Sequence, residues 1–92
     1  MARPKVAQRQ LLEAALELGE ESRLRYRQST NLTSAQLSAA FDTLRRRCMR
    51  YGVDPVIYER WQVNNRGTYT QYLGIRKGYE EWVRRWLEGA RR

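Results

Sequence analysis

The sequence predicts a small α+β domain in which helices pack on one face of a β-hairpin and a carboxy-terminal helix completes the core. Two observations support this prediction. Between residues 56 and 77, side chains alternate in chemical type on both sides of an Asn-Asn-Arg-Gly turn. The flanking segments instead repeat apolar residues at helical spacing. Ninety-two residues suffice for one modest core, so we expect residues 1–92 to form a single domain.

The two alternations agree on one register for the hairpin. With Gly67 in the left-handed conformation that closes a three-residue loop, Val63 lies opposite Tyr69 and Trp61 opposite Gln71. Side chains of a strand point alternately to its two faces, so one face is mostly apolar. The apolar face carries Ile57, Trp61, Val63, Tyr69, Leu73 and Ile75, and the reverse face carries Tyr58, Arg60, Gln62, Thr70, Tyr72 and Arg76.

Two amphipathic helices are predicted before the hairpin. Residues 4–18 repeat apolar side chains on one stripe, and Gly19 is a suitable end for that helix. A second helix begins after a cap at Thr33 or Ser34 and ends near Gly52.

The segment 22–28 leaves two interpretations open, a short strand or a continued helix. We favour the strand, because Gly19 interrupts the helical pattern and turn residues follow at positions 29–31. In a strand, Arg23, Arg25 and Arg27 would share one side, where they would also discourage edge-to-edge aggregation.

A third helix is predicted after Gly78. Its stripe includes Trp82 and Trp86, which we expect to pack on the apolar face of the hairpin, since Trp61 and Tyr69 offer partners of suitable size.

The resulting order is helix, short strand, helix, hairpin, helix. This order resembles that of winged-helix domains, in which a hairpin called the wing follows the recognition helix. A helix-turn-helix also needs a separate helix before the recognition helix, yet residues 37–50 read as one piece. A break at Phe41-Asp42, with Asp42 as a cap, would supply it. The resemblance concerns element order alone and transfers no binding residues.

The composition favours a polyanionic partner. Eighteen basic and ten acidic side chains leave a net charge of +8. Only Lys5 and Lys77 are lysines; the other cations are arginines, which grip phosphate with two hydrogen bonds and stack on bases. A GC-rich genome would also enrich arginine without selection for binding.

The sequence offers little support for catalysis. It has no histidine, and Cys48 is its only cysteine. No cluster of carboxylates supplies a general base or a metal site, so we expect a non-enzymatic protein with no cofactor, metal or small-molecule substrate. An unpaired cysteine fits a reducing compartment, and no apolar run approaches the roughly 18 residues of a membrane span. We therefore expect a cytoplasmic protein with no membrane partner.

The first candidate nucleic-acid contacts lie at the end of the second helix. Arg46, Arg47 and Arg50 are predicted on its outward side with Thr43, while Arg45 flanks the apolar stripe. Such a face fits a major groove or a phosphate backbone. The alternative is a solvated helix end whose arginines offset the helix dipole.

The remaining candidates lie on the hairpin. Arg66 at the turn suits a phosphate or a minor groove, and Arg60 and Arg76 follow on the same ribbon. Tyr58 and Tyr72 are candidates for stacking on unpaired bases. The alternative is that another helix covers these tyrosines.

We therefore expect a small DNA-binding protein with a regulatory role, using the arginine-rich helix and the hairpin wing on duplex DNA, which is favoured over RNA. A homodimer is compatible with this hypothesis. One alternative is an RNA or single-strand binder that uses the hairpin aromatics. The other is an adaptor or inhibitor of the kind encoded by mobile elements, bound to an acidic protein surface.

Overall fold

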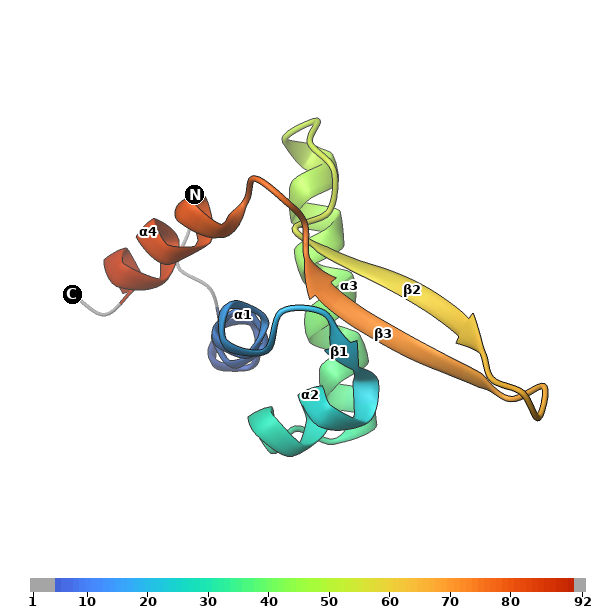
Figure 1. Ribbon diagram of the computed structural model, residues 1–92. Helices are drawn as coiled ribbons and strands as arrows, with labels where there is room; N and C mark the ends of the chain where they lie inside the picture. Colours follow the sequence, from blue (N-terminus) through green and yellow to red (C-terminus); the bar gives the residue numbers. More distant parts are fainter. Residues whose placement is uncertain (1–4, 91–92) are drawn as a thin grey trace.

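The computed structural model describes residues 5–90, which form four helices and a three-stranded antiparallel sheet (Figure 1). Pro4, within the predicted first helix, lies outside the described residues. This is the predicted α+β, winged-helix-like architecture. In chain order the elements are α1 (Val6–Leu18), β1 (Glu21–Ser22), α2 (Arg23–Thr30), α3 (Ser34–Arg50), β2 (Ile57–Val63), β3 (Tyr69–Ile75) and α4 (Glu80–Ala90).

Residues 23–30 form a helix, so the favoured strand for residues 22–28 is wrong. In this part of the chain the strand is limited to Glu21 and Ser22, which pair with β3. The Ser22 hydroxyl then accepts a hydrogen bond from the Arg25 amide at 3.3 Å, which caps α2 at the point where the strand ends. Tyr26 and Thr30, four residues apart, are the buried face of the helix. Burial at helical spacing therefore outweighs the local alternation of arginines.

The new helix completes a helix-turn-helix. Asn31, with a φ of 60°, ends α2 in the left-handed region, and two residues later Thr33 caps α3. The Thr33 hydroxyl accepts from the Gln36 amide at 3.2 Å while the Gln36 side chain accepts from the Thr33 amide at 2.9 Å. Because α2 supplies the separate helix, α3 runs unbroken from Ser34 to Arg50 and needs no break at Phe41-Asp42.

The core lies between α1, α2, α3 and the base of the sheet, and α4 completes it. Tyr26 is fully buried, and its hydroxyl donates to the Gly19 carbonyl at 2.6 Å, which ties α2 to the end of α1. From α4, Val83 and Leu87 enter the same core. The other large, fully buried side chains are Leu11, Leu12, Leu37, Leu44, Val56, Ile57 and Leu73.

The hairpin has the predicted register. Val63 pairs with Tyr69 and Trp61 with Gln71, and Gly67 has a φ of 75°. β3 lies in the middle of the sheet, between β1 and β2. The hairpin is therefore attached to the rest of the sheet through β3, which pairs with β1 as well as with β2.

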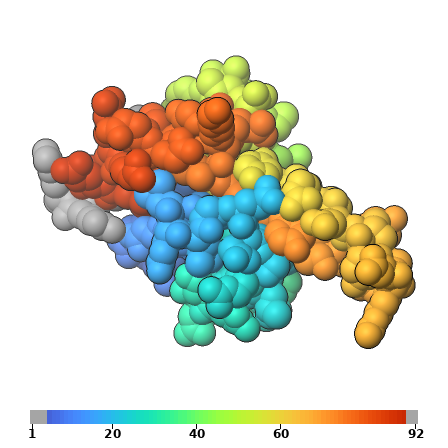
Figure 2. Space-filling view, in the orientation of Figure 1, coloured from blue at the N-terminus to red at the C-terminus, as the bar shows by residue number. Residues whose placement is uncertain are grey.

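Among residues 5–90, the helices cover the base of the hairpin and leave its distal half exposed. Leu73 is 1% exposed, whereas Trp61 and Tyr69, on the same face, are 57% and 66% exposed. The distal half consequently projects from the body of the molecule, as Figures 1 and 2 show. We call this projecting half, residues 61–71, the wing.

The predicted packing of Trp82 and Trp86 on the apolar hairpin face is wrong. α4 lies on the side of the molecule away from the wing and packs against α1 (Figure 1). The smaller residues of its stripe enter the core, and the two indoles stack on each other with ring centroids 5.1 Å apart.

The anchoring of the hairpin predicts unequal effects along one strand. Leu73→Ala should destabilise the fold by about 2–5 kcal/mol, because it empties a buried site. Tyr69→Ala, four residues away on the same face, should change the free energy of unfolding by less than about 0.5 kcal/mol. Urea denaturation of both variants checks this expectation. Equal losses would mean that the wing is packed in solution.

Candidate nucleic-acid interface

The amphipathic period of α3 decides which arginines meet solvent. Leu44 faces the core, so Arg46, two positions further, lies on the opposite side, and Arg50 shares its face one turn later. Both are exposed. Arg45 is also exposed and pairs with Asp42 at 3.5 Å, a weak surface ion pair. These three arginines form the cationic edge of α3.

Two predicted contacts on α3 have partners inside the molecule. The Arg47 guanidinium carbon lies 5.7 Å from the centroid of the Trp86 ring, a cation–π contact with α4. The Thr43 hydroxyl donates to the Ala39 carbonyl at 2.8 Å. The packing therefore turns Arg47 toward α4 and leaves Arg46 and Arg50 on the outward side.

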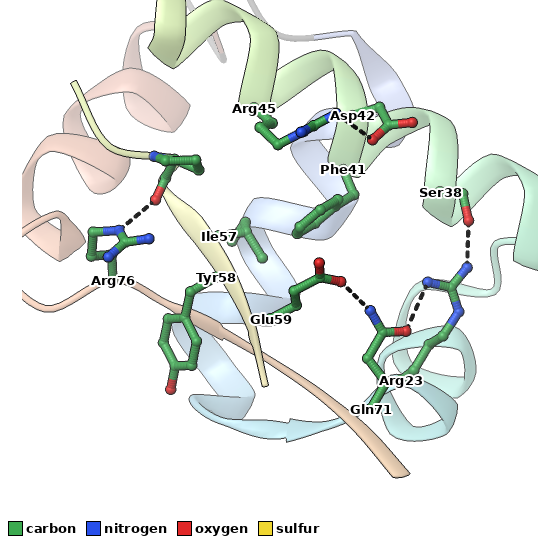
Figure 3. Close-up of a pocket in the computed structure, with 11 residues that line it drawn as sticks. Arg23, Ser38, Phe41, Asp42, Arg45, Ile57, Tyr58, Glu59, Gln71 and Arg76 are labelled. Atoms are coloured by element: carbon green, nitrogen blue, oxygen red, sulfur yellow. Dashed lines mark hydrogen bonds and ion pairs between the residues drawn. The ribbon is translucent and has the colours of Figure 1, made fainter. Parts of the chain in front are cut away.

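A groove of about 520 Å³ separates α3 from the hairpin (Figure 3). We call it the wing groove. One wall is α3, and the other is the base of the hairpin, where Tyr58 and the flanking residues Pro55 and Arg76 join the face that carries Ile57. The lining side chains include Arg23, Ser38, Phe41, Asp42, Arg45, Ile57, Glu59, Gln71 and Arg76.

Arg23 connects the two walls of the wing groove. Its Nη2 donates to the Ser34 carbonyl at 3.0 Å and to the Ser38 hydroxyl at 2.6 Å, while its Nη1 donates to the Gln71 side chain at 3.4 Å. The Gln71 amide donates in turn to the Glu59 carboxylate. As the first residue of α2, Arg23 can reach both α3 and β3, which sets the position of the hairpin beside α3 (Figure 3).

The turn at the end of the wing is ordered by Asn64. Its side-chain oxygen accepts from the Arg66 amide at 2.9 Å and from the Thr68 amide at 3.0 Å. The Arg66 side chain is exposed, and within residues 5–90 no hydrogen bond or ion pair engages its guanidinium. The wing thus ends in an arginine that is free to meet a ligand.

The reverse face of the hairpin is engaged by Glu20, from the loop between α1 and β1. Arg60 donates to one Glu20 oxygen at 2.6 Å, and the Tyr58 hydroxyl donates to the other. The Arg60 guanidinium also lies 4.7 Å from the centroid of the Tyr72 ring. We call these four residues the Glu20 network. It brings together three of the predicted nucleic-acid contacts, but it pairs them with a carboxylate.

The hydrogen bonds of the Glu20 network shift the pKa values of its members. Those from Arg60, and then from Tyr58, lower the pKa of Glu20 below 4.5, because both stabilise the carboxylate. The same bonds raise the pKa of Arg60 and of Tyr58, whose protons the carboxylate holds. The network is therefore most stable with Glu20 ionised.

Two details at the base of the hairpin support this arrangement. Tyr58 lies across Gly74, its partner in the adjacent strand, so closely that a Cβ there would lie 2.7 Å from the phenol carbon and oxygen. One residue after the end of β3, Arg76 donates from its Nε to the Pro55 carbonyl at 2.8 Å. Arg76 therefore ties the end of β3 to the loop before β2.

The described residues offer no metal-binding cluster, since no three His, Cys, Asp or Glu side chains between positions 5 and 90 gather suitably. Cys48 is buried in the core. Over the same residues, each helix is too short or too polar to cross a membrane.

These elements define a winged-helix domain: a helix-turn-helix from α2 and α3, followed by a hairpin whose inner strand also pairs with β1. A solved structure with this fold is that of the circadian clock associated protein Pex from anabaena. The match has a TM-score of 0.66 and covers 98% of this chain and 78% of that chain, at 15% sequence identity. At that identity the likeness concerns the fold alone. No family model and no curated protein matches the sequence.

Sequence reasoning missed the role of Arg23 and the exposure of Trp61 and Tyr69. For Arg23 the error came from the strand predicted in place of α2. For the two aromatic residues a signal was present, since Glu59 and Gln71 interrupt the apolar face of the hairpin at the point where the core ends.

The Glu20 network predicts a pH-dependent contribution to stability. Glu20→Gln should unfold at lower urea concentration than the wild type at about pH 7. Because folding lowers the pKa of Glu20, its contribution is present above the unfolded-state pKa and is lost as pH falls through the folded-state pKa. The difference between the two proteins should therefore disappear at about pH 2.

The matched control is Glu17→Gln, which removes the same charge from an exposed position on α1. Because Glu17 is not part of the Glu20 network, this variant should not show the loss of stability at about pH 7 that is expected of Glu20→Gln. A Glu20→Gln penalty that persists unchanged at low pH would contradict the assignment.

Proposed function

We propose that this chain is a small, cytoplasmic, non-enzymatic protein that binds duplex DNA through α3 and the wing, as a homodimer with a regulatory role. The observation that carries the proposal is the position of the cationic edge of α3 beside a projecting hairpin in a winged-helix fold. In proteins with a helix-turn-helix, the second helix enters the major groove, and its diameter of about 10–12 Å matches a groove about 12 Å wide.

Among the residues predicted from the sequence, three are best placed to contact DNA. Arg46 and Arg50 share the solvent side of α3, and Arg66 occupies the end of the wing. Arg45, at the wing groove, adds a fourth cation. Each guanidinium suits a phosphate or, in the major groove, a guanine edge.

The other predicted contacts would have to exchange a partner within the protein for DNA. Arg47 would leave Trp86, and Arg60 would leave Glu20. Such an exchange lowers the net gain in binding free energy, because the group that the arginine leaves must find a new hydrogen-bond partner or water. We therefore assign these residues, together with Arg76, Thr43, Tyr58 and Tyr72, a supporting role.

The homodimer rests on a second observation, an apolar hollow of about 460 Å³ where the end of α3 meets the start of α4. Its lining includes Cys48, Tyr51, Val53, Tyr79 and Trp82, and Tyr51 and Val53 are exposed. A two-fold dimer that covered these side chains would bring two copies of α3 into one particle, as in dimeric helix-turn-helix proteins that bind two half-sites.

Binding to duplex DNA should depend steeply on salt and on the cationic edge of α3. We expect Arg46→Ala/Arg50→Ala to bind about tenfold or more weakly at low salt, because each charge-assisted contact is worth about 1.5–3 kcal/mol. The slope of log affinity against log salt should become shallower by roughly 0.9 for each phosphate that the variant no longer neutralises. Fluorescence anisotropy at graded salt measures both quantities.

Arg84→Ala/Arg85→Ala on α4 is the matched control, as it removes two exposed arginines from another part of the molecule. It should retain most of the affinity. If the wild type does not bind duplex DNA at low salt, the proposal is wrong. Tighter binding to RNA or single strands would favour the first alternative, and a protein partner retained after nuclease treatment would favour an adaptor.

The homodimer predicts a mass of two chains in sedimentation experiments. Trp82→Glu should shift the protein to monomer, because it places a charge in the apolar hollow. Leu24→Glu, at a 60% exposed position on α2, should remain dimeric. A wild type that sediments as a monomer at high concentration would rule out this part of the proposal.

A further inference from the structure

The wing carries an apolar surface that the other residues between positions 5 and 90 leave uncovered. We call it the apolar wing face; it consists of Trp61, Val63 and Tyr69, each at least half exposed. Val63 lies directly across from Tyr69, and Trp61 is the diagonal neighbour of Tyr69, so the three side chains are contiguous. Contiguous apolar surface of this kind on a small domain usually marks a contact site.

The apolar wing face is a continuation of the wing groove. Glu59 precedes Trp61 by two residues and Gln71 lies directly across from Trp61, so all three point to one face of the ribbon. Glu59 and Gln71 line the groove opposite α3. A ligand held along the exposed side of α3 and across the groove would therefore meet Trp61 and Tyr69 next.

The surrounding charges favour a polyanion as that ligand. Arg66 lies beyond the apolar wing face at the end of the wing, and Arg23 and Arg45 lie before it in the groove. Two carboxylates also line the groove: Asp42 pairs with Arg45, and Glu59 accepts a hydrogen bond from Gln71. With Arg76 counted, the arginines of the groove still outnumber them. A second copy of the same face is a less suitable occupant, because the local cations Arg23, Arg45 and Arg66 of one copy would face those of the other.

The length of the hairpin suits the groove geometry of DNA. A strand rises about 3.3 Å per residue, so Tyr69 lies about 13 Å beyond the buried Leu73. The major groove is about 12 Å wide. With α3 in that groove, the apolar wing face would pass the bordering phosphate strand and reach the adjacent minor groove, where apolar side chains can pack on deoxyribose and wedge between base steps.

We infer that Trp61 and Tyr69 contact deoxyribose and base edges in the minor groove beside α3 and supply a part of the affinity that does not depend on salt. This inference rests on the proposed binding to duplex DNA and adds a second, apolar contact to it. Burial of aromatic surface releases no counterions, whereas each arginine–phosphate contact does. The two kinds of contact are therefore separable by their salt dependence.

The test measures duplex affinity at several salt concentrations. Trp61→Ala/Tyr69→Ala should bind about tenfold or more weakly at every salt concentration, with the slope of the wild type unchanged. Arg66→Ala, a few residues away, should instead make the slope shallower by roughly 0.9. Gln62→Ala, next to Trp61 but on the reverse face, is the matched control and should retain the wild-type affinity. Thermal unfolding of each variant verifies that the fold is intact.

Trp61 also offers a direct spectroscopic signal. Addition of duplex DNA should change the tryptophan emission of the wild type, and Trp61→Phe should lose most of that change while it still binds. A change that persists in Trp61→Phe would come from Trp82 or Trp86 and would contradict the contact.

The outcomes distinguish this inference from the function on which it rests. If the wild type fails to bind duplex DNA, the proposed function fails. If the wild type binds and Trp61→Ala/Tyr69→Ala binds equally well, only the apolar contact is overturned. Loss of single-strand binding alone, or conversion of a dimer to a monomer by the same variant, would also overturn it by assigning the face to a different occupant.

Discussion

The burial of Ile57 and Leu73 at the base of the hairpin is the constraint on which the rest of the arrangement depends. These two side chains join β2 and β3 to the core formed by the helices, and β1 fixes the outer edge of β3. The register then decides which residues face α3 and which face Glu20. Because the core ends at this level, everything from Trp61 to the turn extends into solvent. The wing therefore consists of the part of the two strands that continues beyond the core.

The net charge of the chain does not show which arginines can contact a ligand, because that depends on the partners that each arginine has within the protein. Arg23, Arg47 and Arg60 are held by hydroxyl groups, an indole ring and a carboxylate respectively. Each of them stabilises the contact between two elements. Arg46 and Arg66 have no such bond among the described residues. The arginine-rich composition thus divides into cations that build the fold and cations that remain exposed beside it.

The hairpin and α3 were predictable because their signals are local. Alternation on both sides of Gly67 specifies the register, and Thr33 with Gln36 specifies the start of α3. The segment 22–28 was not predictable in this way, since its helix depends on burying Tyr26 against α1, a tertiary effect. For the candidate site, the exposed arginines of α3 followed from helical period, but Glu20, the ion-pair partner of Arg60, lies forty residues away in sequence. No local pattern carries that information.

The hairpin is held from both faces at nearly the same height. On one face Arg23 bonds to Gln71, and on the other Glu20 bonds to Arg60, whose pairing partner is Tyr72. Below this level the ribbon cannot tilt without breaking one of the two attachments, while above it the described residues maintain its shape through the strand pairing and the Asn64 turn. Any bending of the end segment would therefore begin beyond these two attachments, and α3 and the core would keep their positions.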